Sequence, residues 1–268
     1  MTPRVALVTG ASRGMGAAVA RLLAADGFAV AAADVRDCRP VANEIRGAGG
    51  VAEAYDCDIR SWDAVATLIS QAEGDLGPLR ACVQVAGVSR VVPFLEMEPI
   101  RWRQVLDVNI DGTFHVCRLA AERIVDNGGG SIVAISSTAA KFAWDSTAHY
   151  SVSKAAIEAL VRNMAHELGR WGVRVNAVAP GTIRTPATVD ELAMPGVEAS
   201  ETAACPLGRI GEPMDIAQAV RFLCDDARSA WITGQSLVVD GGYSTHGQGA
   251  DFGSTVDTFL EGHGGEHA

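Results

Sequence analysis

Tyr150 and Lys154 stand four residues apart at the start of a segment with a helical pattern. Residues at positions i and i+4 of a helix lie on one face about one turn apart, so the phenol and the ammonium are expected to be neighbours. A phenol has an unperturbed pKa of about 10, and a nearby cation favours its ionised form. The pair could therefore act as a general acid or base near neutral pH. Without further support, both could equally be ordinary surface residues.

Two more polar residues are candidates for the same site. Ser137 follows the apolar run 131–136, which is typical of a buried strand, so its hydroxyl is predicted to lie at the carboxyl edge of a sheet. A hydroxyl there could hydrogen-bond a substrate oxygen. Asn109 lies within a long predicted helix, 99–126, where helix propensity would prefer another residue, and a solvated face is its simplest explanation.

The composition favours one large α/β domain that could position these residues. The chain has 268 residues, of which 48% are hydrophobic and 20% charged, and no linker-like segment divides it. We expect a single catalytic domain over 1–245 and an irregular tail over 246–268. The net charge of -10 argues against nucleic acid or an anionic membrane as a partner. No apolar run reaches the length of a signal-peptide core or a membrane span, so a cytoplasmic location is expected.

The six cysteines are dispersed, without a C-x-x-C pair or a histidine at metal-binding spacing, and are expected to be reduced core thiols. His263 and His267 lie in the tail, where a disordered polar segment is a simpler explanation than a metal site. No metal site is therefore predicted.

The first strand, turn and helix have the order that a dinucleotide site requires. The apolar run 5–8 leads into a glycine-rich turn, and the helical pattern 17–25 follows. Glycines allow positive φ and close backbone approach, while the free N–H groups at a helix start attract a pyrophosphate. The spacing G-x-x-x-G-x-G differs from the usual G-x-G-x-x-G. The candidate coenzyme contacts in this turn are Gly10, Ser12, Arg13, Gly14, Met15 and Gly16.

The second and third strands, 28–34 and 51–55, add acidic residues at their ends. Asp34 is eighteen residues beyond Gly16, close to the spacing of a carboxylate that binds the adenosine ribose hydroxyls, and Val35 follows it. After the third strand, the segment Cys57, Asp58 and Ile59 would lie beside the adenine. Asp58 could equally be the N-cap of the next helix, 62–73.

Strands and helices continue to alternate along the chain, which predicts a parallel sheet with right-handed crossovers. Ala86 and Gly87, at the end of strand 79–87, leave little side-chain bulk near a coenzyme. A strand over 173–179 stops at Pro180 and Gly181. Segment 182–213 is poorly periodic and is typical of a mobile active-site lid. A final helix, 214–226, and strand, 235–239, close the pattern.

Together these residues closely resemble the classical short-chain dehydrogenase/reductase family over about Arg4 to Tyr243. The resemblance rests on Thr9-Gly10 with Gly14 and Gly16, Ala86-Gly87, Asn109, Ser137, Tyr150 with Lys154, Asn176, Pro180-Gly181 and 206–213. It implies a three-layer Rossmann-like fold with one doubly wound, seven-stranded parallel sheet. It also implies a catalytic tetrad of Asn109, Ser137, Tyr150 and Lys154, with Asn109 holding a water that links Lys154 to solvent. Ile183 and Thr185 would meet the nicotinamide carboxamide.

The chain departs from the family where Gln84-Val85 replaces the usual Asn-Asn before Ala86-Gly87. The hydrogen bonds made by those asparagines must therefore differ here. The resemblance also implies a homotetramer paired through the helices that carry Asn109 and Tyr150, where the small residues Ala155, Ala156 and Ala159 would allow close helix contact.

The expected activity is reversible hydride transfer between a nicotinamide coenzyme and a secondary alcohol or ketone, with Tyr150 as general acid or base. Asp34 favours NAD(H), although Arg13 and Arg36 could attract the 2′-phosphate of NADP(H). The alternatives are an NADPH-dependent 3-ketoacyl-thioester reductase and a dinucleotide-binding protein without turnover. The substrate is a small molecule of unknown identity. Apolar residues that could either line its pocket or fill the core are Val91, Val92, Phe142, Trp144, Leu192 and Met194.

Overall fold

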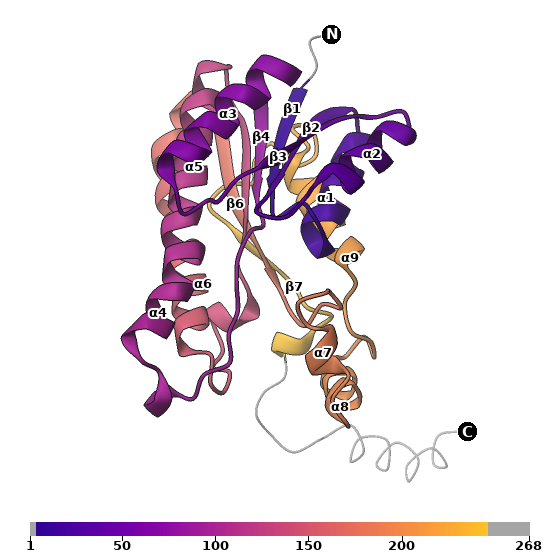
Figure 1. Ribbon diagram of the computed structural model, residues 1–268, viewed down its shortest axis with the longest axis vertical. Coiled ribbons are helices and arrows are strands. Elements are labelled where there is room, and N and C mark those ends of the chain that lie inside the picture. The colour runs from indigo at the N-terminus through magenta and orange to yellow at the C-terminus, as the bar shows by residue number, and fades with distance from the viewer. Residues whose placement is uncertain (1–3, 246–268) are drawn as a thin grey trace, which may run out of the picture.

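The computed structural model describes residues 4–245 and has at its centre a seven-stranded sheet in which every paired strand is parallel (Figure 1). The strands lie in the order β3-β2-β1-β4-β5-β6-β7. Their bounds are β1 Arg4–Thr9, β2 Phe28–Asp34, β3 Val51–Asp56, β4 Leu79–Gln84, β5 Gly130–Ile135, β6 Val173–Pro180 and β7 Ser236–Val239. This sheet confirms the predicted fold class.

Helices cover both faces of the sheet (Figure 1). One face packs against α1 (Gly14–Ala25), α2 (Arg39–Gly47) and α9 (Pro213–Cys224), and the other against α3 (Trp62–Leu76), α5 (Thr113–Asp126) and α6 (Ala148–Leu168). The shorter helices are α4 (Pro99–Leu106), α7 (Val189–Leu192) and α8 (Val197–Ala204). Within residues 4–245, no helix has both the length and the apolar character needed to cross a bilayer.

The strands are apolar along nearly their whole length because a parallel sheet is buried on both faces. Along β1, Ala6 and Val8 pack into one apolar cluster, while Val5 and Leu7 pack into the cluster on the opposite face. All six cysteines are buried and free, which confirms their prediction as core thiols. His263 and His267 lie outside the described residues, as does the predicted tail.

The chain reverses its direction of winding between β1 and β4, which are neighbours in the sheet although β2 and β3 separate them in sequence. At such a point the loops leaving the two strands diverge, one above each face, and open a crevice at the carboxyl ends. The predicted coenzyme residues at the ends of β1, β2 and β4 are thereby brought to one edge of the sheet.

Two expectations from the sequence were wrong in detail. The predicted helix 99–126 is interrupted by a π-helical turn, Asp107–Gly112, that contains Asn109. Asn109 is 1% exposed, so the solvated-face explanation is wrong. Segment 182–213, which was predicted as a lid, contains the short helices α7 and α8. Its two ends are also tied together, with Arg184 N–H donating to the Gly211 carbonyl over 2.8 Å.

Candidate active site

The glycine turn between β1 and α1 has no room for side chains. Gly10 has φ of +66°, and a Cβ atom on it would lie 2.8 Å from the backbone nitrogen of Ala86. A Cβ atom on Gly16 would lie 2.1 Å from the Gly10 carbonyl oxygen. Both contacts are with backbone, which cannot move aside. The turn can therefore pack against β4 and leave the N–H groups at the start of α1 facing the crevice.

Asp34 is held in a fixed orientation by the glycine turn. Ser12 donates to its Oδ2 atom from the hydroxyl over 2.6 Å and from the backbone N–H over 3.3 Å. The backbone N–H of Arg36 donates to Oδ1 over 3.0 Å. These bonds link the carboxylate at the end of β2 to the loop after β1. Ser12, predicted to contact the coenzyme, is thus also the residue that orients Asp34.

A cavity of about 290 Å³ opens between these segments at the carboxyl edge of the sheet. Most of the residues predicted to contact the coenzyme line this cavity. Those lining it are Gly10, Arg13, Gly14, Met15, Gly16, Asp34, Val35, Cys57, Asp58, Ile59, Ala86, Gly87 and Thr185. The glycine turn, the ribose-binding candidate Asp34 and the start of segment 182–213 therefore line one cavity.

Asp58 does not cap the following helix. Ser61 is the N-cap of α3, and its hydroxyl accepts from the Ala64 N–H over 3.2 Å. Asp58 instead pairs with Arg60 over 2.5 Å, and this hydrogen-bonded pair holds the pKa of Asp58 below its usual value. The capping interpretation was wrong because Asp58 lies three residues before the N-cap of α3. Asp58 lines the cavity, and its place beside the adenine stays a prediction.

Lys154 is buried and points back toward the sheet. It is 4% exposed, and its Nζ atom donates to the Ile135 carbonyl over 2.8 Å. The same Nζ lies 5.5 Å from the centre of the Tyr150 ring, so the predicted pair is brought together. Burial lowers the pKa of Lys154 to about 8, because water no longer stabilises the ammonium.

Tyr150 is partly buried at the start of α6. Burial raises the pKa of its phenol, and a hydrogen bond with the Ser137 side chain acts in the opposite direction. The sequence predicted a lowered pKa for Tyr150, whereas burial raises it. Burial removes the water that would stabilise the phenolate, and this loss outweighs the effect of Ser137.

Asn109 fixes the segment that follows β4. Its side-chain oxygen accepts from the Val88 N–H over 2.8 Å, and its amide donates to the Val88 carbonyl over 2.9 Å and to the Ser153 hydroxyl over 3.0 Å. A Cβ atom on Gly87 would lie 3.3 Å from the Asn109 oxygen and 3.5 Å from Lys154 Nζ. Asn109 and Lys154 therefore both lie beside Gly87, where the absence of a side chain leaves space next to them.

Gln84, which stands where the family usually has asparagine, makes hydrogen bonds that the sequence did not predict. Its oxygen accepts from the Thr9 hydroxyl, and its amide donates to the Ala86 carbonyl over 2.9 Å and to the Thr113 hydroxyl over 3.1 Å. Thr9 in turn accepts from the Ala86 N–H over 3.2 Å. Gln84 therefore connects β1, β4 and α5 directly below the crevice.

The segment after β6 faces two different cavities. Gly181 packs so closely on Asp240 that a Cβ atom would lie 2.8 Å from the Asp240 Cβ. Thr185 lines the 290 Å³ cavity, whereas the Ile183 side chain is 5% exposed and lines a separate cavity of about 130 Å³. The contact of Ile183 with the nicotinamide carboxamide stays a prediction, and its buried side chain leaves the backbone as the part of Ile183 that could make it. Pro180 is buried at the end of β6.

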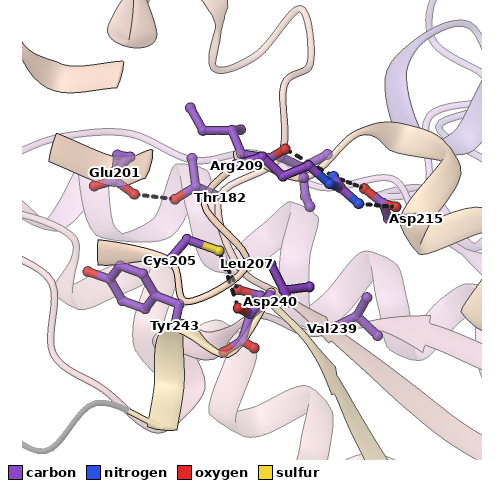
Figure 2. Close-up of a pocket in the computed structure, with 13 residues that line it drawn as sticks. Thr182, Glu201, Cys205, Leu207, Arg209, Asp215, Val239, Asp240 and Tyr243 are labelled. Atoms are coloured by element: carbon purple, nitrogen blue, oxygen red, sulfur yellow. Dashed lines mark hydrogen bonds and ion pairs between the residues drawn. The ribbon is translucent and has the colours of Figure 1, made fainter. Parts of the chain in front are cut away.

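Figure 2 shows the residues that line this smaller cavity and the bonds between them. The Thr182 hydroxyl donates to Glu201 over 2.6 Å, which ties the end of β6 to α8. Arg209 makes two bonds to Asp215, of 2.7 and 2.9 Å, at the start of α9. Among the apolar residues considered for a substrate pocket, Leu192 is buried, whereas Phe142 and Met194 are exposed.

Comparison with known proteins identifies similar enzymes. A family model described as enoyl-(acyl carrier protein) reductase matches residues 10–244. The chain is 38% identical over 241 residues to the 7α-hydroxysteroid dehydrogenase of Escherichia coli K12, covering 89% of this chain and 93% of that protein.

Solved structures agree with this result. A short-chain type dehydrogenase/reductase from Mycobacterium marinum is 35% identical, with a TM-score of 0.85 and coverage of 91% of this chain and 96% of that one. A gluconate 5-dehydrogenase from Burkholderia cenocepacia, solved with NADP and tartrate, is 29% identical, with a TM-score of 0.86 and coverage of 92% and 97%.

Proposed function

The chain belongs to the short-chain dehydrogenase/reductase family of oxidoreductases, and we propose that it interconverts a secondary alcohol and a ketone with NAD(H) as the preferred coenzyme. One observation carries the proposal. The buried Lys154 Nζ lies 5.5 Å from the centre of the Tyr150 ring and would lie 3.5 Å from a Cβ atom on Gly87, which lines the cavity that also contains Asp34. The crevice fits a nicotinamide dinucleotide, which would supply the hydride donor or acceptor when bound.

Each side chain of the site has a separate role in the proposed reaction. Tyr150 takes the hydroxyl proton of the alcohol during oxidation and returns it during reduction. Ser137 positions the substrate oxygen beside the phenol. Lys154 in its charged form stabilises the phenolate and reaches the nicotinamide ribose, and Asn109 holds the water that connects Lys154 to solvent. Gly10, Gly14 and Gly16 let the backbone approach the pyrophosphate.

The substrate class is tested by an activity screen. Purified protein is assayed with NAD+ or NADH against cyclic, aliphatic, sugar and steroid alcohols and ketones, with acyl-thioester substrates in parallel. We expect coenzyme-dependent turnover of secondary alcohols or ketones. Coenzyme binding without any turnover would favour a non-catalytic dinucleotide-binding protein instead.

We predict that NAD(H) is preferred over NADP(H) by at least about tenfold in kcat/KM, because Asp34 would repel a 2′-phosphate. At about 4 Å and an effective dielectric near 20, the repulsion is at most roughly 4 kcal/mol per pair of unit charges. Asp34 cannot turn away, since Ser12 and the Arg36 backbone hold both of its oxygens. Steady-state kinetics with both coenzymes measures the preference.

Asp34→Ala should relax this preference toward NADP(H). The matched control is Asp37→Ala, which removes an exposed carboxylate that pairs with Arg39 close by in the sequence. It should leave the coenzyme ratio unchanged. Equal or better use of NADPH by the wild type would contradict the assignment. It would favour the 3-ketoacyl-thioester reductase, an alternative supported by Arg13 and Arg36 in the cavity wall.

We also predict a homotetramer. An apolar groove of about 400 Å³ runs between α5 and α6, the helices whose pairing the family resemblance implies. Its apolar lining residues are Phe114, Ala121, Val125, Leu160, Met164, Leu168 and Trp171. Burying such a surface against a second copy would release water from it. Light scattering at micromolar concentration should give four times the chain mass.

Met164→Glu places a charge in this groove and should shift the assembly to smaller species. Glu44→Ala on α2, at the opposite face of the sheet, is the control and should leave the mass unchanged. A monomeric wild type at the same concentration would contradict the predicted assembly.

A further inference from the structure

Glu158 is a buried carboxylate on α6, one helical turn beyond Lys154. It is 8% exposed, and none of the ion pairs formed within residues 4–245 includes it. Tyr150, Lys154 and Glu158 recur at intervals of four residues, so they lie along one face of the helix. Burying an unpaired carboxylate is unfavourable unless hydrogen bonds replace its hydration, so the contacts of Glu158 have to compensate for that loss.

Two serines at the ends of different strands have hydroxyls within hydrogen-bonding distance of the same oxygen of Glu158. The Ser236 hydroxyl, at the start of β7, donates to Oε1 over 2.6 Å. The Ser136 hydroxyl, just after β5, lies 3.2 Å from the same Oε1 and 3.2 Å from the Lys154 carbonyl oxygen. Glu158 therefore joins α6 to the ends of two strands.

These contacts bear directly on the position of Ser137. Ile135, Ser136 and Ser137 are consecutive, and the first two are both attached to α6. The Ile135 carbonyl accepts from Lys154 Nζ over 2.8 Å, and the Ser136 hydroxyl is held by Glu158. Ser136 is also fixed to β6, because its N–H donates to the Val178 carbonyl over 2.7 Å. The placement of Ser137 relative to the helix that carries Tyr150 depends on this set of bonds.

We propose that Glu158 is a positioning residue that sets the distance between the Ser137 hydroxyl and the Tyr150 phenol by tying α6 to Ser136 and Ser236. The proposal rests on the proposed function of Ser137 and Tyr150. Glu158 itself touches neither substrate nor coenzyme. What the site requires at position 158 is a hydrogen-bond acceptor of the right length rather than a negative charge.

Glu158→Ala and Glu158→Gln separate these two requirements. Alanine removes the acceptor, so kcat should fall by at least about tenfold while the Kd for NAD(H) changes by less than about threefold. Glutamine keeps an acceptor oxygen at the same place and should restore at least about half of the wild-type kcat. Ser236→Ala should also lower kcat, but by a smaller factor than Glu158→Ala. Ser131→Ala, which removes a buried hydroxyl from the other end of β5, is the matched control and should leave kcat unchanged.

A second readout does not require turnover. Ultraviolet difference titration, with Tyr150→Phe used to identify the Tyr150 signal, measures the pKa of the phenol. Since Ser137 acts to lower that pKa, loss of its alignment in Glu158→Ala should raise it by about half a unit or more, with no such change in Glu158→Gln. If Glu158→Ala does not fold, kcat and the pKa of Tyr150 are measured in Ser236→Ala instead.

Wild-type kcat and an unchanged Tyr150 pKa in Glu158→Ala would overturn the proposal. A Glu158→Gln variant as inactive as Glu158→Ala would also overturn it, because charge rather than the acceptor would then matter. In either case an inactive Tyr150→Phe variant would leave the proposed function standing. Wild-type turnover by Tyr150→Phe would instead contradict the proposed function itself.

Discussion

Replacing Tyr150 by phenylalanine should lower kcat by about 10² to 10⁴-fold, the range typical of a lost general acid or base. The change removes one hydroxyl from the chemical step and almost no binding surface. The Kd for NAD(H) should therefore stay within about threefold of the wild-type value. Single-turnover kinetics with the best substrate from the screen, together with coenzyme titration, measures both quantities.

Tyr55→Phe is the matched control for this variant. Its hydroxyl donates to Asp75, near the end of α3, over 2.9 Å, and Tyr55 does not line the 290 Å³ cavity. We expect wild-type kcat for this control. Unchanged turnover in Tyr150→Phe would remove Tyr150 from its assigned role, whereas an equal loss in both variants would indicate a defect in folding.

The second large effect that we expect is the pH dependence of alcohol oxidation. Oxidation requires the phenolate of Tyr150 as proton acceptor, so its rate should rise with pH by up to about tenfold per unit below the apparent pKa. Ketone reduction requires the protonated phenol and should fall over the same range. Measuring kcat/KM for both directions from pH 6 to 10, under conditions where chemistry limits the rate, tests this.

The pH at which the rate of alcohol oxidation rises depends on the coupled titration of Tyr150 and Lys154. Burial lowers the pKa of Lys154 to about 8 and raises that of Tyr150, so the pair loses its first proton near pH 8. The singly deprotonated pair includes the reactive form with a phenolate beside an ammonium. With NAD+ as the hydride acceptor, kcat/KM for alcohol oxidation should therefore rise through about pH 8. A flat profile would contradict the assignment of Tyr150 as the base.

The parts of the site that could be predicted from sequence are those encoded by short local patterns. The turn from Gly10 to Gly16 needs glycine because backbone atoms pass within van der Waals distance. The helical spacing of Tyr150 and Lys154 places them together, and Asp34 follows from the end of a buried strand. Each pattern depends on residues that are close in the chain, so tertiary contacts were not needed to recognise it.

The features that the sequence did not predict depend on residues far apart in the chain. Nothing local indicates that Asn109 lies in a π-helical turn, or that Ser12 holds Asp34. Gln84 takes its partners from two other elements, as does Glu158. A buried polar side chain looks the same in sequence as an exposed one until its partners are known.

The most direct test of the account uses a secondary alcohol deuterated at the carbinol carbon. The protein is incubated with NAD+ and the labelled alcohol, and the reduced coenzyme is examined by mass spectrometry and NMR. We predict one deuterium at C4 of the nicotinamide ring, with the transfer lost in Tyr150→Phe and retained in Tyr55→Phe. Ketone formation with no deuterium in the coenzyme, or undiminished transfer in Tyr150→Phe, would contradict the proposed mechanism.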